Sequence, residues 1–399
     1  MAIRLIFSKL EPGIFRCACQ PLRHIMFNNR LICPLLAQFI VGAQFVFGAA
    51  YVVSRRGLRL CALLLTVACG LRTAECLGQT ELLAQEDRII YGPALPRSSN
   101  VWNPPPAITL TGKIEKLDQS FLEFTSSAGQ QHKLPSDRIE RVEVAWANAD
   151  AASAHARYAH REYLLALKKN DEVLRGGGIP KWQQCILLAE LVESAEAIGR
   201  PEVAGQLFLV LTQQKPADFL TATIPLNWTS RELTPALEKA ARDWLARPDD
   251  YAGLLGASWL LLTDEAEAAK KRLQAIQANP SKLMQRLATM QLWRATPPSE
   301  TTGNIRNWST ARDTLSLPLQ LGPTEFMAER FARVDKTNLA IGEWLRIAAT
   351  HAHHPHRAQA ALEAAQLRLG RLEDKSASKS AAAWLNELSI AVEVEDIDR

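Results

Sequence analysis

Two stretches of this chain, 64 residues apart, share one pattern of apolar residues between an alanine and a proline. The Ala stands twelve residues before the Pro in both, at Ala204 and Pro216 and again at Ala268 and Pro280. The residues between them have the spacing of a helix. Because 64 residues is close to twice the length of a helical hairpin of about 34 residues, the pattern predicts two non-adjacent units of a degenerate helical repeat.

The first unit contains residues that begin and end helices. Pro180 is tolerated in the first turn of a helix, and apolar residues then recur at helical spacing as far as Ile198. Gly199 ends this helix and Pro201 begins its partner. A small residue at Ala204 allows the two helices to approach closely. The stretch 180–216 is therefore predicted to form a helical hairpin.

This hairpin resembles a tetratricopeptide (TPR) repeat. Four of its residues fall at the family's inter-helix turn, helix crossing, following turn and final proline, namely Gly199, Ala204, Phe208 and Pro216. The second unit, at about 250–280, matches at Ala268, Ala275 and Pro280. Weaker copies cover 324–355 and 357–389. The resemblance implies that 149–399 is a superhelical array with a concave groove that binds a protein or peptide partner, without catalysis or a cofactor.

Residues 107–146 change to a two-residue period. Apolar positions alternate here and are interrupted at Asp118 and Gly129, which favours four or five short antiparallel strands. The spacing resembles a small SH3-like or Sm-like barrel. An Sm-like module would suggest RNA binding, but residues 113–143 carry five basic and six acidic side chains and so form no basic face. We expect a packing or protein-docking module and no nucleic-acid partner.

The N-terminal region 1–78 is predicted to be a signal or membrane anchor. Residues 31–53 carry no charge and are long enough to span a bilayer. Residues 60–71 are shorter and follow three arginines, which is the layout of a secretory signal peptide. A lipid anchor on Cys69 is a third interpretation. Each of them predicts export to the periplasm or cell envelope, with membrane contact only through this region, followed by a Pro-rich spacer at 79–106.

A different interpretation of the front of the chain makes residues 1–53 a spurious extension. The true start would then lie near Val52 or Val53 and the signal peptide would follow at once. No Met occurs between Met26 and Met284, so this start would need an alternative codon.

Charge and cysteine both divide near residue 76. Of the 46 Lys/Arg and 42 Asp/Glu residues, 1–76 hold nine and two, which leaves 37 and 40 for the remainder. The body is therefore not basic, as a nucleic-acid-binding domain would be. Six of the seven cysteines also precede residue 77, so the body has only Cys185 and cannot form an internal disulfide.

The densest group of potential ligands is a run of four histidines at the predicted end of a repeat, His351, His353, His354 and His356. Imidazoles bind zinc and copper, and alternating positions of an extended segment can converge on one ion. No Asp, Glu or Cys is adjacent in the sequence, and polar residues at such an exit are expected to be solvated. A metal-binding or enzymatic protein is thus the alternative to a non-catalytic scaffold.

Overall fold

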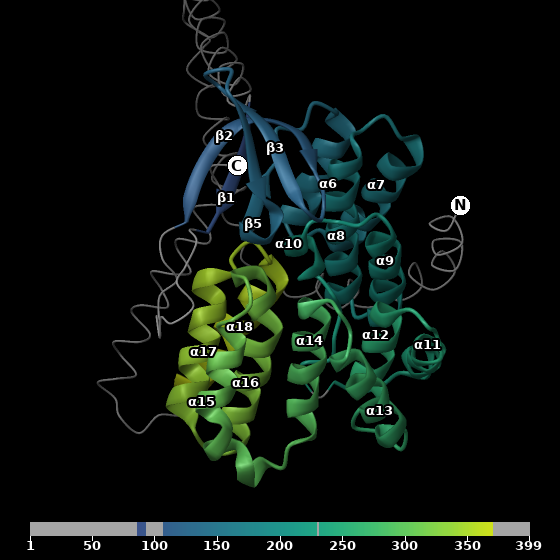
Figure 1. Ribbon diagram of the computed structural model, residues 1–399, viewed down its shortest axis with the longest axis vertical. Coiled ribbons are helices and arrows are strands. Elements are labelled where there is room, and N and C mark those ends of the chain that lie inside the picture. The colour runs from purple at the N-terminus through teal and green to yellow at the C-terminus, as the bar shows by residue number, and fades with distance from the viewer. Residues whose placement is uncertain (1–85, 93–106, 230, 370–399) are drawn as a thin grey trace, which may run out of the picture. The chain divides into compact units, whose positions relative to one another are not determined.

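The computed structural model describes residues 86–92, 107–229 and 231–369, which form a small antiparallel sheet followed by thirteen α-helices (Figure 1). The predicted mainly α fold with a preceding β module is confirmed. All these residues belong to one unit of the chain, 86–399. The signal or anchor region at 1–78 and the end of the fourth repeat copy lie outside the described residues. Among the described residues, no helix is long and apolar enough to cross a membrane.

Five short strands form the sheet in the order β4-β3-β2-β1-β5, and every neighbouring pair is antiparallel. The strands are β1 Asp87–Tyr91, β2 Ile108–Leu117, β3 Phe121–Ser126, β4 Gln131–Pro135 and β5 Ile139–Glu143, with a 3₁₀ turn, η3 Ser136–Arg138, before β5. Successive side chains of a strand point to opposite faces. One face buries Ile89, Leu122 and Ile139 almost completely, so the sheet has its own apolar core.

Strand β1 lies within residues 79–106, which we expected to be a spacer. Its five residues contain no proline and occupy an inner position, where Ile89 lies opposite Leu110 of β2 and Val142 of β5. The buried Asp87 carboxylate accepts the N–H groups of Ile114 and Ala145 at 2.8 and 2.9 Å. Because these partners lie far along the chain, the short β1 pattern alone does not reveal the strand.

The helices follow one another along the chain, and most of them contact the next. Their bounds are α6 Ala149–Ala159, α7 Tyr163–Gly176, α8 Lys181–Ala197, α9 Pro201–Gln213, α10 Asp218–Thr221, α11 Pro235–Leu245, α12 Asp250–Leu260, α13 Ala266–Gln277, α14 Lys282–Leu292, α15 Thr301–Arg312, α16 Leu321–Arg333, α17 Thr337–Thr350 and α18 Pro355–Leu369. Short connections fold α9 back on α8, α13 on α12 and α18 on α17. The described helices are thus an array of packed hairpins.

The turn between α8 and α9 has the conformation expected of a helix end. Gly199 adopts φ +75°, which side chains with a Cβ rarely adopt, and its N–H donates to the carbonyl of Glu196. The N–H of Arg200 donates to the carbonyl of Ala195 at 2.9 Å. Pro201 then occupies the first turn of α9, where its missing N–H costs nothing.

Helix α8 is the central helix of the first part of the array. It contacts α6, α7, α9 and α10, and nearly all its residues from Trp182 to Glu196 are buried. The sequence predicted one apolar face, but the helix is covered on almost every side. Three acidic residues, Glu190, Glu193 and Glu196, are buried with its leucines. Buried carboxylates require partners, and those of Glu193 come from distant segments.

The segment between α9 and α11 connects the sheet to the helices. Helix α10 contacts β5 and η3, and residues 220–228 are buried. Trp228 packs so closely on Gly322 of α16 that a Cβ at position 322 would overlap its indole ring. The backbone N–H of Asn227 donates to the hydroxyl of Ser258 on α12 at 2.9 Å. This loop is therefore an ordered part of the interior.

Candidate functional site

The four clustered histidines lie where α17 ends and α18 begins. The N–H of His351 still donates to the carbonyl of Ile347, and the N–H of His354 donates to the carbonyl of His351, both at 2.9 Å. Residues 351–354 therefore form a tight turn, and we name them the histidine turn. The turn ends at Pro355 because proline disfavours helical backbone at the residue before it and is well suited to the first position of a new helix.

The turn brings three imidazoles together. His351, His353 and His354 each offer a nitrogen, and these three atoms lie within 4.8 Å of one another. The ring centroids of His353 and His354 are 4.2 Å apart, and that of His351 is 6.1 and 6.3 Å from them. A tight turn, rather than the extended segment expected from the sequence, is what gathers them.

Two of these rings are buried, contrary to the solvated exit that we expected. His351 is 1% exposed and His354 is 6% exposed, whereas His353 is half-buried. Burial lowers the pKa of His351 well below its usual value, and the positive charges of Arg357 and Arg346 lower it further. His351 is therefore a neutral imidazole, the form that can ligate a metal.

Glu193 of α8 contacts the histidine turn from a position 161 residues earlier in the chain. One of its carboxylate oxygens accepts a hydrogen bond from Nδ1 of His354, and the other accepts the hydroxyl of Tyr158 on α6. Burial raises the pKa of Glu193, but the hydrogen bonds from His354 and Tyr158 and the charge of Arg357 together hold it below its usual value. Glu193 is therefore an ionised acceptor.

The bond to Glu193 determines the tautomer of His354. An ionised carboxylate only accepts hydrogen bonds, so Nδ1 of His354 carries the proton. Nε2 of His354 and Nδ1 of His351 are buried and have no hydrogen-bond partner among the described residues. Most buried polar atoms are paired, because an unpaired one costs about 1–3 kcal/mol. Two unpaired nitrogens in one turn therefore require a physical explanation.

Two of the positive charges near the turn pair with carboxylates other than Glu193. The guanidinium of Arg357 pairs with Glu325 of α16 through both carboxylate oxygens, with Nε to Oε1 at 2.7 Å. Arg346 donates to the carboxylate of Asp313 at 3.4 Å and to the side chain of Gln320 at 3.0 Å. Each of these guanidinium groups thus has a carboxylate partner of its own, while Glu193 bonds His354.

His356 does not belong to the group of three. Its ring meets Tyr163 of α7 edge to face, with centroids 6.1 Å apart. Burial lowers the pKa of His356, with opposing contributions from neighbouring charges. The four-histidine group predicted from the sequence therefore divides into a cluster of three and a separate ring that packs at the start of α7.

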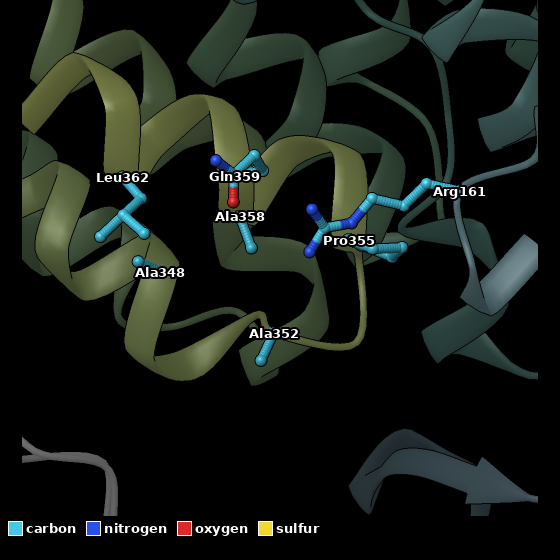
Figure 2. Close-up of a pocket in the computed structure, with 7 residues that line it drawn as sticks. All are labelled: Arg161, Ala348, Ala352, Pro355, Ala358, Gln359 and Leu362. Atoms are coloured by element: carbon cyan, nitrogen blue, oxygen red, sulfur yellow. The ribbon is translucent and has the colours of Figure 1, made fainter. Parts of the chain in front are cut away.

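A small hollow borders the histidine turn, and Figure 2 shows Arg161 extending into it toward Pro355. The empty volume of this hollow is about 310 Å³, a figure that includes space open to solvent. The lining residues are Arg161, Ala348, Ala352, Pro355, Ala358, Gln359 and Leu362. Ala352 belongs to the turn and Pro355 follows it directly. One side of the turn therefore faces this hollow.

The repeat residues predicted in the first unit fall within the α8–α9 hairpin. Gly199 is exposed in the turn, and Ala204 and Phe208 of α9 are completely buried. Pro216 is buried just after α9 ends. Gly205 lies so close to Trp244 of α11 that a Cβ would overlap the indole ring, which places small residues where α9 meets its neighbours.

The second unit has the same pattern of burial, but one residue later than we aligned it. Ala268, Ala275 and Pro280 are exposed. The buried residues of α13 are Ala269, Leu273 and Ile276. Ala269 and Ile276 directly follow the predicted Ala268 and Ala275, and Leu273 lies one turn after Ala269. Helix α9 begins at Pro201 and α13 at Ala266, which accounts for the shift. The packing roles assigned to the predicted residues stay a prediction.

Sequence reasoning missed Glu193 and Tyr158, which complete the histidine site. The available signal was the occurrence of acidic residues at every third position, Glu190, Glu193 and Glu196, in a helix otherwise rich in leucine. Charged residues on a buried helix indicate a polar partner elsewhere in the fold. The partner could not be identified, because His354 lies on a different hairpin.

The fold is that of an α-helical array that carries a small antiparallel sheet, with a histidine turn between its last two described helices. No protein-family model, curated protein or solved structure matches the chain.

Proposed function

We propose that this chain is a non-catalytic scaffold that binds a protein or peptide partner through its helical array. The observation that supports this proposal is the packing of successive hairpins from α6 to α18, most of them in contact with the next helix in the chain. Arrays of this kind present an extended surface built from many helices. The α8–α9 hairpin, with its turn glycine and buried Ala204 and Phe208, supports the finer interpretation that the array is TPR-like.

Two exposed leucines on α7 are the part of this surface that we assign to the partner. Leu164 and Leu165 are 42% and 51% exposed and are consecutive, whereas the other exposed large apolar side chains of the described residues occur singly. Adjacent exposed apolar groups are more typical of a contact surface than scattered ones. Export, an anchor in residues 1–78 and a docking role for the SH3-like or Sm-like sheet belong to the same proposal.

The test compares partner capture by three versions of the full-length chain. The double variant Leu164→Asp/Leu165→Asp places charge on the proposed contact, and Leu262→Asp is the matched control because Leu262 is also 51% exposed. Envelope proteins crosslinked to each version are identified, and the enriched one is purified and titrated back. We expect binding to be lost in the double variant and kept in the control. Equal binding by all three versions would exclude the α7 surface, and the absence of a titratable partner would contradict scaffolding.

A further inference from the structure

We propose that His351, His353 and His354 bind one divalent transition-metal ion of the kind that prefers imidazole, such as Zn²⁺ or Cu²⁺. This metal-site proposal does not depend on the proposed partner surface on α7. The proposal rests on the convergence of three imidazoles, on two buried nitrogens that have no partner among the described residues, and on a carboxylate that orients one of the rings.

The spacing of the three rings is close to that of a metal site. Zinc holds imidazole nitrogens at about 2.0–2.1 Å, so the nitrogens around one ion lie about 3–4 Å apart. The ligand atoms in the histidine turn lie within 4.8 Å of one another. Modest rotation of the rings, and of the half-buried His353 first, would bring them to an ion. No movement of α17 or α18 is needed, because one four-residue turn carries all three.

Glu193 supplies the second contact that metal-binding histidines usually have. A ligating imidazole typically donates its other N–H to a carboxylate, which sets the tautomer and makes the ligand nitrogen more basic. Glu193 accepts from Nδ1 of His354, which leaves Nε2 as the ligand nitrogen. The hydroxyl of Tyr158 holds the other oxygen of Glu193. Burial and the charge of Glu193 raise the pKa of Tyr158, so this hydroxyl keeps its proton.

A metal ion would also account for the unpaired atoms. Nδ1 of His351 and Nε2 of His354 have no hydrogen-bond partner among the described residues, and both side chains are more than nine-tenths buried. Coordination to one ion would satisfy both nitrogens. The local charge also favours a cation. Arg357 is already paired with Glu325, and the carboxylate of Glu193 directly bonds the cluster.

The protein offers three ligands and leaves a further position. Tetrahedral zinc with three protein ligands takes water or another small ligand as its fourth. The hollow bounded by Ala352 and Pro355 gives solvent access beside the turn (Figure 2). The structure therefore assigns a three-histidine site rather than a closed four-ligand one.

A purely structural role for the same residues makes a different prediction. His354 and Glu193 could simply form a buried charged pair, with no ion between the rings. In that case His353, which is half-buried and outside the pair, would have no influence on metal binding. The decisive variant is therefore His353→Ala, which removes one proposed ligand and leaves the Glu193 contact in place.

The experiment is calorimetric titration of Zn²⁺, and separately of Cu²⁺, into the full-length chain and its variants. We expect the wild-type chain to bind one saturable equivalent more than His353→Ala. The matched control is His356→Ala, which removes a neighbouring ring outside the cluster and should keep that equivalent. Because six cysteines precede residue 77 and can also bind metal, the difference between variants is the quantity that counts.

A second variant separates orientation from ligation. Glu193→Gln keeps the shape of the side chain but weakens the contact to His354, and loss of such a contact typically lowers metal affinity by about 10- to 100-fold. Thermal unfolding with and without Zn²⁺ checks that each variant folds, and only chains that retain the site should be stabilised by the metal. Equal numbers of bound equivalents in wild type and His353→Ala would overturn the proposal.

Discussion

The α8–α9 turn and the histidine turn both reverse the chain between two helices, but they are built from different kinds of residue. Each reverses the chain between two helices and is followed by a proline, Pro201 or Pro355, in the first turn of the second helix. The first is made by an exposed glycine at positive φ, while the second buries two of its imidazoles. A chain reversal between two helices thus needs only a suitable backbone conformation, and the buried polar groups of the histidine turn go beyond that requirement.

The largest effect should come from breaking the polar contact of the histidine turn. His354→Ala leaves one oxygen of the buried, ionised Glu193 without its hydrogen-bond donor, which should cost about 3 kcal/mol or more, because an unsatisfied buried group costs about 1–3 kcal/mol and a charged one more. The free energy of unfolding is measured with urea at neutral pH. His160→Ala, at an exposed position after α6, is the control and should change stability by less than about 0.5 kcal/mol. Equal effects of both variants would show that the Glu193 contact does not stabilise the fold.

A smaller effect is expected from overfilling the apolar hairpin. Ala204→Trp inserts a large ring at a completely buried position and should cost about 1–3 kcal/mol. The matched variants are Ala268→Trp, which is exposed, and Ala269→Trp, which is buried. Melting temperatures should fall for 204 and 269 and stay nearly unchanged for 268. A fall at 268 with none at 269 would restore the original alignment of the two units.

The glycine turn itself should be sensitive to a side chain. Gly199→Ala forces a Cβ into backbone with φ +75° and should destabilise the protein by about 1 kcal/mol. Gly303 is the control, because it lies inside α15 and a Cβ there meets nothing within 4 Å. Gly303→Ala should stabilise by about 0.5–1 kcal/mol, since alanine loses less entropy in a helix. Changes of the same sign in urea unfolding would contradict the proposed role of Gly199.

Helix α8 contributes to both regions, and its single thiol reports on its burial without altering stability. Burial raises the pKa of Cys185 to about 11, with a small opposing contribution from Lys181. Since the thiolate is the reactive form, we expect native Cys185 to resist alkylation at pH 8 and to react once the chain is unfolded. Mass spectrometry of the peptide that contains Cys185 measures this, and rapid labelling of the native chain would show that α8 is not enclosed.

The comparison also explains which features could be predicted from sequence. Gly199 and Pro201 carry local signals, so the first hairpin was predicted close to its observed bounds. Burial in the second unit falls one residue later than in the alignment, because Ala268 and Ala269 are both alanines and the sequence pattern could not distinguish the buried one. Strand β1 was missed because its partners, β2 and β5, are distant in sequence.

The histidine site shows the same limit more sharply. The cluster of histidines is obvious in the sequence, but its burial depends on Glu193, which lies on another hairpin. Without that partner, polar residues at a helix end are expected to face solvent. The structure separates His356 from the other three for a similar reason, since its neighbour Tyr163 begins α7.

The central claim is that the histidine turn is built to hold an ion rather than only to reverse the chain. Its most direct measurement is anomalous X-ray scattering at the zinc edge from crystals of the chain grown with Zn²⁺. We predict a peak among the rings of His351, His353 and His354, at about 2.0–2.1 Å from each ligand nitrogen. Well-ordered rings with no anomalous peak between them, in crystals containing excess zinc, would contradict the claim.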